Sequence, residues 1–209
     1  VEGFSATTYK GTATTNYIGG VGFQPDFVWM KNREIAASHG LYDAIRGTGT
    51  AKSLKSDSTA AEGNASTNMN LVSFDSDGFT LGATSGTNQI NYEADGHIAW
   101  CWDMGGSNAT LTAGSINSTV RANPTYGQSI VSYTANGTAG ATVAHGLSSA
   151  PEMIIAKRRN SAEDWGVGHT SLGWTKFIRL NTTGAAATAT SLWNDTAPSN
   201  TLVTLGDSG

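Results

Sequence analysis

The chain has 209 residues, a net charge of −4 and 13% charged residues, against about 25% in an average globular protein. It contains no basic block and no apolar run of about 18 residues, so we expect neither nucleic-acid binding nor membrane insertion. The single cysteine, Cys101, excludes an intrachain disulfide and a cysteine-based zinc site, and we interpret it as a small buried hydrophobic residue.

The strand signals are short and separated by Gly-, Asn- and Ser-rich turns. Residues 26–32 and 152–158 are each apolar for four consecutive positions and then basic, which is typical of a strand covered on both faces. Residues 34–46 are the best helix candidate, but Gly40 interrupts them and we favour loop and strand. An Asp-Ser-Asp-Gly turn predicts a hairpin over 70–82. Further strands are expected in residues 97–104, 128–134, 176–180 and 200–206.

The two apolar runs belong to a longer repeat. "GVGFQPDFVWMKNR" (20–33) and "GLSSAPEMIIAKRR" (146–159) align with a constant separation of 126 residues, as between Pro25 and Pro151. The separation then becomes 124 residues, as between "FTLG" (79–82) and "VTLG" (203–206). Several short matches in one order predict a tandem duplication.

This repeat defines the expected organisation: an all-β chain of two tandem, related β-sandwich modules of jelly-roll or lectin-like type. We expect the first module at 1–106, a connector at 107–128 and the second module at 129–209. The second module has no counterpart of the strand at 97–104. We therefore expect either that the chain is a fragment of a longer product or that a neighbouring chain or segment completes the second module.

Two basic pairs occur at equivalent places in both halves. Lys31 and Arg33 align with Lys157 and Arg159, and residues two apart in a strand share one face. They are candidates for anion or sugar-acid contacts, or for contacts between subunits. The alternative is a structural role in which they form ion pairs or cap carbonyl groups at the end of the strand.

Aromatic residues in loops are the candidates for ligand binding, because Trp and Tyr can stack on sugar rings and still offer one polar group. Packing beneath a loop is the alternative for each of them. Trp29, Trp100 and Trp102 lie in expected strands and are interpreted as core. The loop candidates are Trp165, Trp174, Trp193 and Tyr42.

The sequence offers no positive argument for catalysis. It contains no HExxH, no Gly-x-Ser-x-Gly and no phosphate-binding loop, and no spacing singles out a pair of carboxylates. Asp75 and Asp77 superficially resemble the start of a calcium loop, but a hairpin turn explains them better and a bound ion there is left open. We therefore expect no enzyme, no resident metal and no cofactor.

Several phrases together resemble a domain found in tail-fibre and other appendage proteins of tailed bacteriophages, notably marine ones. They are "GFQPDFVWMKNR", "SHGLYDAIRG", "FDSDGFTLG" and "AWCWDMGG" in the first half, and "NGTAGATVAHGLSSAPEMIIAKRRN", "DWGVGH", "LWNDTAPS" and "VTLG" in the second. The resemblance implies a lectin-like β-sandwich on the surface of a virion, with other virion proteins or further copies of the chain as partners.

Three functional hypotheses follow from these expectations. The first is a non-enzymatic appendage protein that binds host surface glycan or supports the module that does. The second is a purely structural subunit that decorates a capsid or assembles a fibre. The third is a polysaccharide depolymerase, which would need two carboxylates facing one another across a groove.

Overall fold

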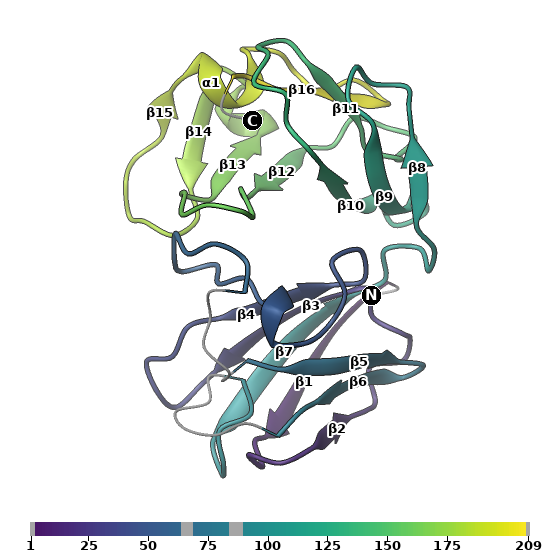
Figure 1. The fold of residues 1–209 in the computed structure, drawn as a ribbon, viewed down its shortest axis with the longest axis vertical. Coiled ribbons are helices and arrows are strands. Elements are labelled where there is room, and N and C mark those ends of the chain that lie inside the picture. Colours follow the sequence, from purple (N-terminus) through teal and green to yellow (C-terminus); the bar gives the residue numbers. More distant parts are fainter. Residues whose placement is uncertain (1–2, 64–68, 84–89, 208–209) are drawn as a thin grey trace. The chain divides into compact units, whose positions relative to one another are not determined.

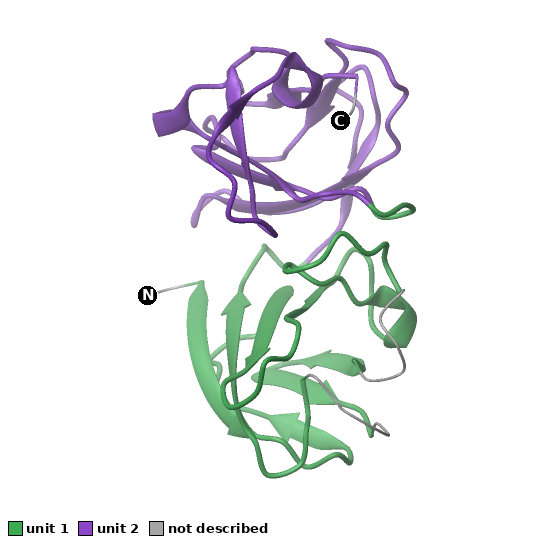
Figure 2. Cartoon of the chain, turned by 90° about the vertical axis from the view of Figure 1, so that its left-hand side faces the viewer, with its two compact units in different colours: residues 1–106, 159–162 green, residues 107–158, 163–209 purple. Residues whose placement is uncertain are grey.

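A computed structural model describes residues 3–63, 69–83 and 90–207. In this part of the chain nearly all regular structure is β-strand, and the helical segments are single turns (Figure 1). The chain divides into two compact units, which Figure 2 distinguishes by colour. Unit 1 contains residues 1–106 and 159–162, and unit 2 contains residues 107–158 and 163–209. Among the described residues, no helix combines the length and the apolar character needed to span a membrane.

Unit 1 is built from two antiparallel sheets. The four-stranded sheet has the order β1-β7-β3-β4 and the three-stranded sheet has the order β2-β6-β5. A 3-10 turn at Thr50–Lys52 follows β4. The strands are β1 Phe4–Lys10, β2 Asn16–Ile18, β3 Phe27–Asn32, β4 Gly40–Asp43, β5 Leu71–Asp75, β6 Gly78–Leu81 and β7 Gly96–Trp102.

The core of unit 1 contains buried side chains from both sheets. In β3, Val28 and Met30 are fully buried, whereas Phe27 and Trp29 on the other face are partly exposed. This alternation is the period of two that a β-strand imposes. The other members of the core are Ile18, Val21, Tyr42, Met69, Leu71, Phe79, Leu81, Ile90, Ala99 and Cys101. Unit 1 is therefore an all-β, sandwich-type fold with its hydrophobic core between the two sheets.

Unit 2 contains three smaller sheets, ordered β10-β9-β8, β11-β16 and β12-β13-β14-β15. Its core includes Trp174 and Trp193 together with aliphatic side chains such as Val143 and Val203. Its elements are β8 Ala109–Leu111, β9 Ser118–Asn123, β10 Gln128–Tyr133, β11 Thr142–Ala144, β12 Met153–Ala156, β13 Gly166–His169, a 3-10 turn at Thr170–Leu172, β14 Lys176–Arg179, β15 Ala187–Thr188, α1 Thr190–Trp193 and β16 Leu202–Thr204.

Most of the expected strands are confirmed, and one expectation is wrong. β5 and β6 form the hairpin predicted at 70–82, and β4 lies within 34–46, where loop and strand were favoured over a helix. The expected connector at 107–128 instead contains β8 and β9, and β9 pairs with β10 along its whole length. β9 has the sequence Ser-Thr-Val-Arg-Ala-Asn, which is too polar to indicate a strand without its partner.

The two units share a pairing register. Phe27, Val28, Trp29 and Met30 of β3 pair with Asp43, Tyr42, Leu41 and Gly40 of β4. Each of these eight positions lies 126 residues before its counterpart in β12 and β13, where Met153 pairs with His169 and Ala156 with Gly166. β2 and β11 also begin and end 126 residues apart. A tandem duplication predicts this agreement; the duplication itself stays a prediction.

Candidate functional site

The four loop aromatics predicted to bind ligand are buried, so that prediction is wrong. Tyr42 lies in β4 rather than in a loop, and Trp165, Trp174 and Trp193 are all at most slightly exposed. The Trp174 and Trp193 rings meet edge to face with their centroids 5.8 Å apart, inside the core of unit 2. None of these side chains presents a flat face to solvent.

Gly168 explains how unit 2 accommodates two tryptophans. It occupies the position of β13 that Tyr42 occupies in β4. A Cβ atom placed on Gly168 would lie 2.6 Å from the ring of Trp174 and 2.9 Å from that of Trp193. The absence of a side chain at this position therefore makes room for both indoles, a tertiary effect that composition does not reveal.

The tryptophans interpreted as core lie instead on the outer face of the four-stranded sheet of unit 1. Trp100 and Trp102 alternate along β7 with the fully buried Ala99 and Cys101 and are themselves only partly buried. Trp29 has the same orientation in β3. The alternation of small and aromatic residues in "AWCW" is the sequence signal for this arrangement.

Cross-strand pairing brings five aromatic side chains together on this face, which we call the aromatic face. One row across the sheet pairs Phe4, Trp102 and Phe27. The next row with side chains on the same face pairs Ala6, Trp100 and Trp29. Figure 1 shows β1, β7 and β3 side by side in unit 1. The aromatic face consists of Phe4, Phe27, Trp29, Trp100 and Trp102.

The rings of the aromatic face touch one another at an angle. The Trp102 centroid lies 5.1 Å from that of Phe4 and 5.0 Å from that of Phe27, with ring planes at 57° and 41°. Trp29 and Trp100 meet edge to face at 6.2 Å. These are tilted and edge-to-face geometries of the kind that aromatic pairs adopt, and all five side chains of the aromatic face are partly buried.

A hydrogen bond fixes the orientation of Trp29. Its indole Nε1–H donates to Nδ1 of His39 at 2.8 Å, so this ring nitrogen must be unprotonated. Burial lowers the pKa of His39, which favours the neutral form, although Asp57 nearby acts in the opposite direction. The backbone N–H of His39 also donates to Oδ1 of Asp57 at 3.2 Å, which holds the loop in place.

The repeated lysines cap carbonyl groups at the ends of equivalent strands. Nζ of Lys31 donates to the carbonyl of Asn32 at 2.7 Å, and Nζ of Lys157 donates to the carbonyl of Arg158 at the same distance. This is the structural role that the sequence left as an alternative. Arg33 is exposed, and an anion or interface contact there stays a prediction.

Arg159 contributes to a buried ionic cluster in unit 1. Its Nη2 lies 2.7 Å from Oε2 of Glu62, whose other oxygen lies 3.2 Å from Nη1 of Arg46. Nε of Arg46 donates to Oδ2 of Asp43. We call Asp43, Arg46, Glu62 and Arg159 the ionic cluster, in which each of the two carboxylates is bonded to a guanidinium.

The two aspartates considered for a bound ion are occupied by protein groups. Asp77 accepts hydrogen bonds from the backbone N–H groups of Gly20 and Gly22, at 3.1 and 2.6 Å. Asp75 accepts one from the Thr80 hydroxyl at 2.7 Å. Within the described residues, no group of three or more His, Cys, Asp or Glu side chains is arranged to hold a metal ion.

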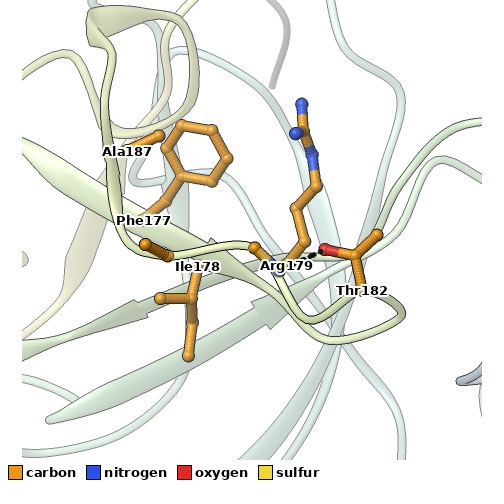
Figure 3. Close-up of a pocket in the computed structure, with 7 residues that line it drawn as sticks. Phe177, Ile178, Arg179, Thr182 and Ala187 are labelled. Carbon is orange, nitrogen blue, oxygen red and sulfur yellow. Dashed lines mark hydrogen bonds between the residues drawn. The ribbon is translucent and has the colours of Figure 1, made fainter.

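A small cavity lies in unit 2 beside β14 and the loop that follows it (Figure 3). Its volume of about 20 Å³ accommodates a single water molecule. Arg179 at its edge is already bonded to Asp164, with Nε 2.7 Å from Oδ2. The cavity is therefore too small for a sugar or a cofactor, and the aromatic face is the better candidate site.

The comparisons with known proteins identify a family but no characterised relative. No curated protein and no solved structure matches the chain significantly. One family matches residues 2–209, which is nearly the whole chain, and it is described as a domain of unknown function, DUF7483. The chain, with its two β units and its aromatic face, belongs to this family.

Proposed function

We propose that this chain is a non-enzymatic component of a bacteriophage tail fibre or related appendage, and that it binds host surface glycan through the aromatic face. The observation that carries the proposal is the cross-strand cluster of Phe4, Phe27, Trp29, Trp100 and Trp102. The virion location rests on the resemblance of the repeated phrases to appendage domains. Other virion proteins or further copies of the chain are the expected assembly partners.

Several properties of the aromatic face suit a sugar ligand. Contiguous apolar surface on a folded unit marks an interaction site more often than isolated exposed residues do. The C–H faces of a sugar ring pack on aromatic rings, and the aromatic side chains lie on paired strands, so little conformational entropy is lost on binding. Lys31 and Ile98 pair across the next row of the same sheet, which extends the face with one basic and one aliphatic group.

Two carboxylates of unit 1, Asp43 and Glu62, are poorly placed for hydrolysis. A glycosidase needs one carboxyl group as an acid and another as a base or nucleophile. Asp43 and Glu62 both flank Arg46 and are almost fully buried, so a guanidinium occupies the space between them. A polysaccharide depolymerase is for this reason the less favoured hypothesis.

The test is binding of the chain to an array of bacterial surface polysaccharides, compared with two variants. Trp102→Ala removes the ring that contacts both Phe4 and Phe27, and we expect it to weaken binding by about tenfold or more. Tyr17→Ala is the matched control, because Tyr17 is an exposed aromatic residue on β2 in the other sheet. Circular dichroism verifies that both variants fold.

Three outcomes would contradict the proposal. The chain binds no polysaccharide, or Trp102→Ala binds as tightly as the unchanged chain, or both variants lose the same affinity. Release of reducing ends from a polysaccharide would instead support the depolymerase hypothesis.

The second candidate function is purely structural, as a capsid-decorating or fibre-assembly subunit. The observation that favours it is in unit 2, where Met153, Ile155 and Ile178 are large apolar side chains with exposed surfaces. They lie on β12 and β14, on either side of β13, and exposed apolar groups within one sheet are typical of surfaces that another polypeptide covers.

A further inference from the structure

Unit 2 has an unoccupied strand position where unit 1 contains β7. In unit 1, β3 lies between β7 and β4 in one sheet. In unit 2 the counterpart of β3 is β12, because the β12–β13 register repeats the β3–β4 register. Among the described residues, β12 pairs with β13 only and forms the edge of its sheet.

The backbone of β12 presents hydrogen-bonding groups at this edge. The Thr170 N–H donates to the Glu152 carbonyl at 2.9 Å, as the Ala44 N–H donates to the Asp26 carbonyl at 2.8 Å in unit 1. Bonded pairs alternate along an antiparallel ladder. The N–H and C=O groups of Met153 and Ile155 therefore point away from β13, as those of Phe27 and Trp29 point toward β7.

Two apolar side chains of β12 are exposed on one face of the strand. In unit 1, side chains of β7 lie beside their counterparts. Met153 and Ile155 are 56% and 41% exposed. Their counterparts in unit 1 are partly buried, because Phe27 contacts Trp102 and Trp29 contacts Trp100, both from β7. The exposure of the two apolar residues is what the absence of a neighbouring strand predicts.

The inner face of β12 shows the same deficit. Ile154 and Ala156 are only partly buried, whereas Val28 and Met30 of β3 have no exposed surface. β10 is also an edge strand, and its Tyr133 packs against the same core as Ile154. The core of unit 2 is thus less completely covered than that of unit 1 along the edge of β12.

We propose that unit 2 is a strand acceptor, which binds an extended peptide segment of β7-like sequence antiparallel to β12. The segment comes from polypeptide outside these 209 residues. Its chemistry is defined by β7: small side chains such as Ala99 and Cys101 face the core, and aromatic side chains such as Trp100 and Trp102 face outward. Such β-augmentation gains affinity from main-chain hydrogen bonds and specificity from alternate side chains.

A second copy of the chain is not the proposed donor. Among the described strands, β7 has the required pattern, but it is already paired with both β1 and β3. Donating it to another molecule would open the four-stranded sheet of unit 1. The donor must therefore be a segment that is free to become a strand.

The experiment uses the full chain and a synthetic peptide with the sequence of residues 95–104, carrying Cys101→Ser to prevent oxidation. We expect saturable binding by fluorescence anisotropy, and at least about tenfold slower hydrogen exchange at the amides of Met153 and Ile155. A peptide with the same residues in scrambled order is the control and should do neither. The exchange measurement needs no variant, so it remains decisive if a variant fails to fold.

A pair of variants tests the geometry of binding. Ile155→Pro removes an N–H that points away from β13, and proline is tolerated at such edge positions. We expect it to weaken peptide binding by about tenfold or more, since one ladder bond and the strand geometry are lost. Ile155→Ala retains the N–H and is the matched control, with a smaller loss.

Three results would overturn the proposal. The peptide fails to bind at millimolar concentration, or it binds without slowing exchange in β12, or the chain alone is a dimer with these amides already protected. The last result would assign the position to a second copy. Because the exchange measurement and both variants are in unit 2, failure here leaves the proposal for the aromatic face of unit 1 unaffected.

Discussion

β3 of unit 1 and β12 of unit 2 pair with their next strands in the same register but have different surroundings. β3 is a central strand whose inner side chains have no exposed surface, whereas β12 is an edge strand with two exposed apolar side chains. The same strand pair therefore occurs in both units, although among the described residues only β3, and not β12, has a third strand on its other side. Pairing register and burial are therefore separate properties of this fold.

The units also differ in how charge is distributed. Unit 1 contains the ionic cluster, in which the side chain of Arg46 is only 5% exposed. Its most comparable pair in unit 2, Arg179 with Asp164, has side chains that are 49% and 28% exposed. Position 172, which corresponds to Arg46, is a leucine. Among the described residues the ionic cluster lies in unit 1, and replacing its members tests the stability of that unit.

The largest effect is expected from removing Arg46. Arg46→Ala leaves the carboxylates of Asp43 and Glu62 buried with less compensation, so we expect unit 1 to lose about 3–5 kcal/mol of unfolding free energy. Arg179→Ala in unit 2 should cost less than about 1 kcal/mol, since that pair is solvated. Hydrogen exchange of the β6 and β13 amides measures the two units separately. Equal losses in the two variants would contradict the comparison.

A smaller effect is expected at Gly168, where unit 2 has glycine and unit 1 has Tyr42. Gly168→Ala places a methyl group 2.6 Å from the Trp174 ring, and overpacking of this kind costs about 1–3 kcal/mol. Gly184→Ala is the matched control, because its Cβ would meet only the Thr182 hydroxyl at 3.5 Å. Exchange of the β13 amides reports the difference. A neutral Gly168→Ala would show that the two indoles can move apart.

The smallest effect is expected from pH, because protonation of His39 changes its contribution to the stability of the aromatic face. Burial lowers the pKa of His39 below its usual 6.5, so the unfolded chain takes up a proton at a higher pH than the folded chain. The contribution of His39 to stability is complete above about pH 6.5 and decreases as the pH falls through the folded pKa. Because His39 is half-buried, we expect less than about 1 kcal/mol.

The measurement is Trp fluorescence and amide exchange in unit 1 between pH 7.5 and 5. The pKa of His97, also in unit 1, is lowered by burial as well, so the pH profile of His39→Gln must be subtracted. Protonation of His39 removes the acceptor for the Trp29 indole, and only the subtracted profile reports that event. Identical profiles for the chain and for His39→Gln would refute this role.

The strands could be predicted where the sequence carries its own signal. The apolar runs at Phe27 and Met153 and the Asp-Ser-Asp-Gly turn each determine local structure through short-range geometry. β9 could not be predicted, because its polar residues become a strand only by pairing with β10. Sequence periodicity identifies a strand and which of its residues share a face.

The site was predicted less well, for a physical reason. Periodicity does not say which face of a strand is covered, so the aromatic residues of β7 were assigned to the core. The burial of Trp174 and Trp193 depends on the missing side chain of Gly168, which lies against both rings. No sequence pattern links these three residues. Both errors concern tertiary contacts, which no window of sequence contains.

The difference between Tyr42 and Gly168 has a consequence for folding. Adjacent repeats of similar sequence are prone to exchange equivalent strands and form misassembled hybrids. If β4 entered unit 2, the Tyr42 side chain would collide with the space that Trp174 and Trp193 fill; if β13 entered unit 1, it would leave a void where Tyr42 packs. The mismatch in side-chain volume at this shared position disfavours both exchanges.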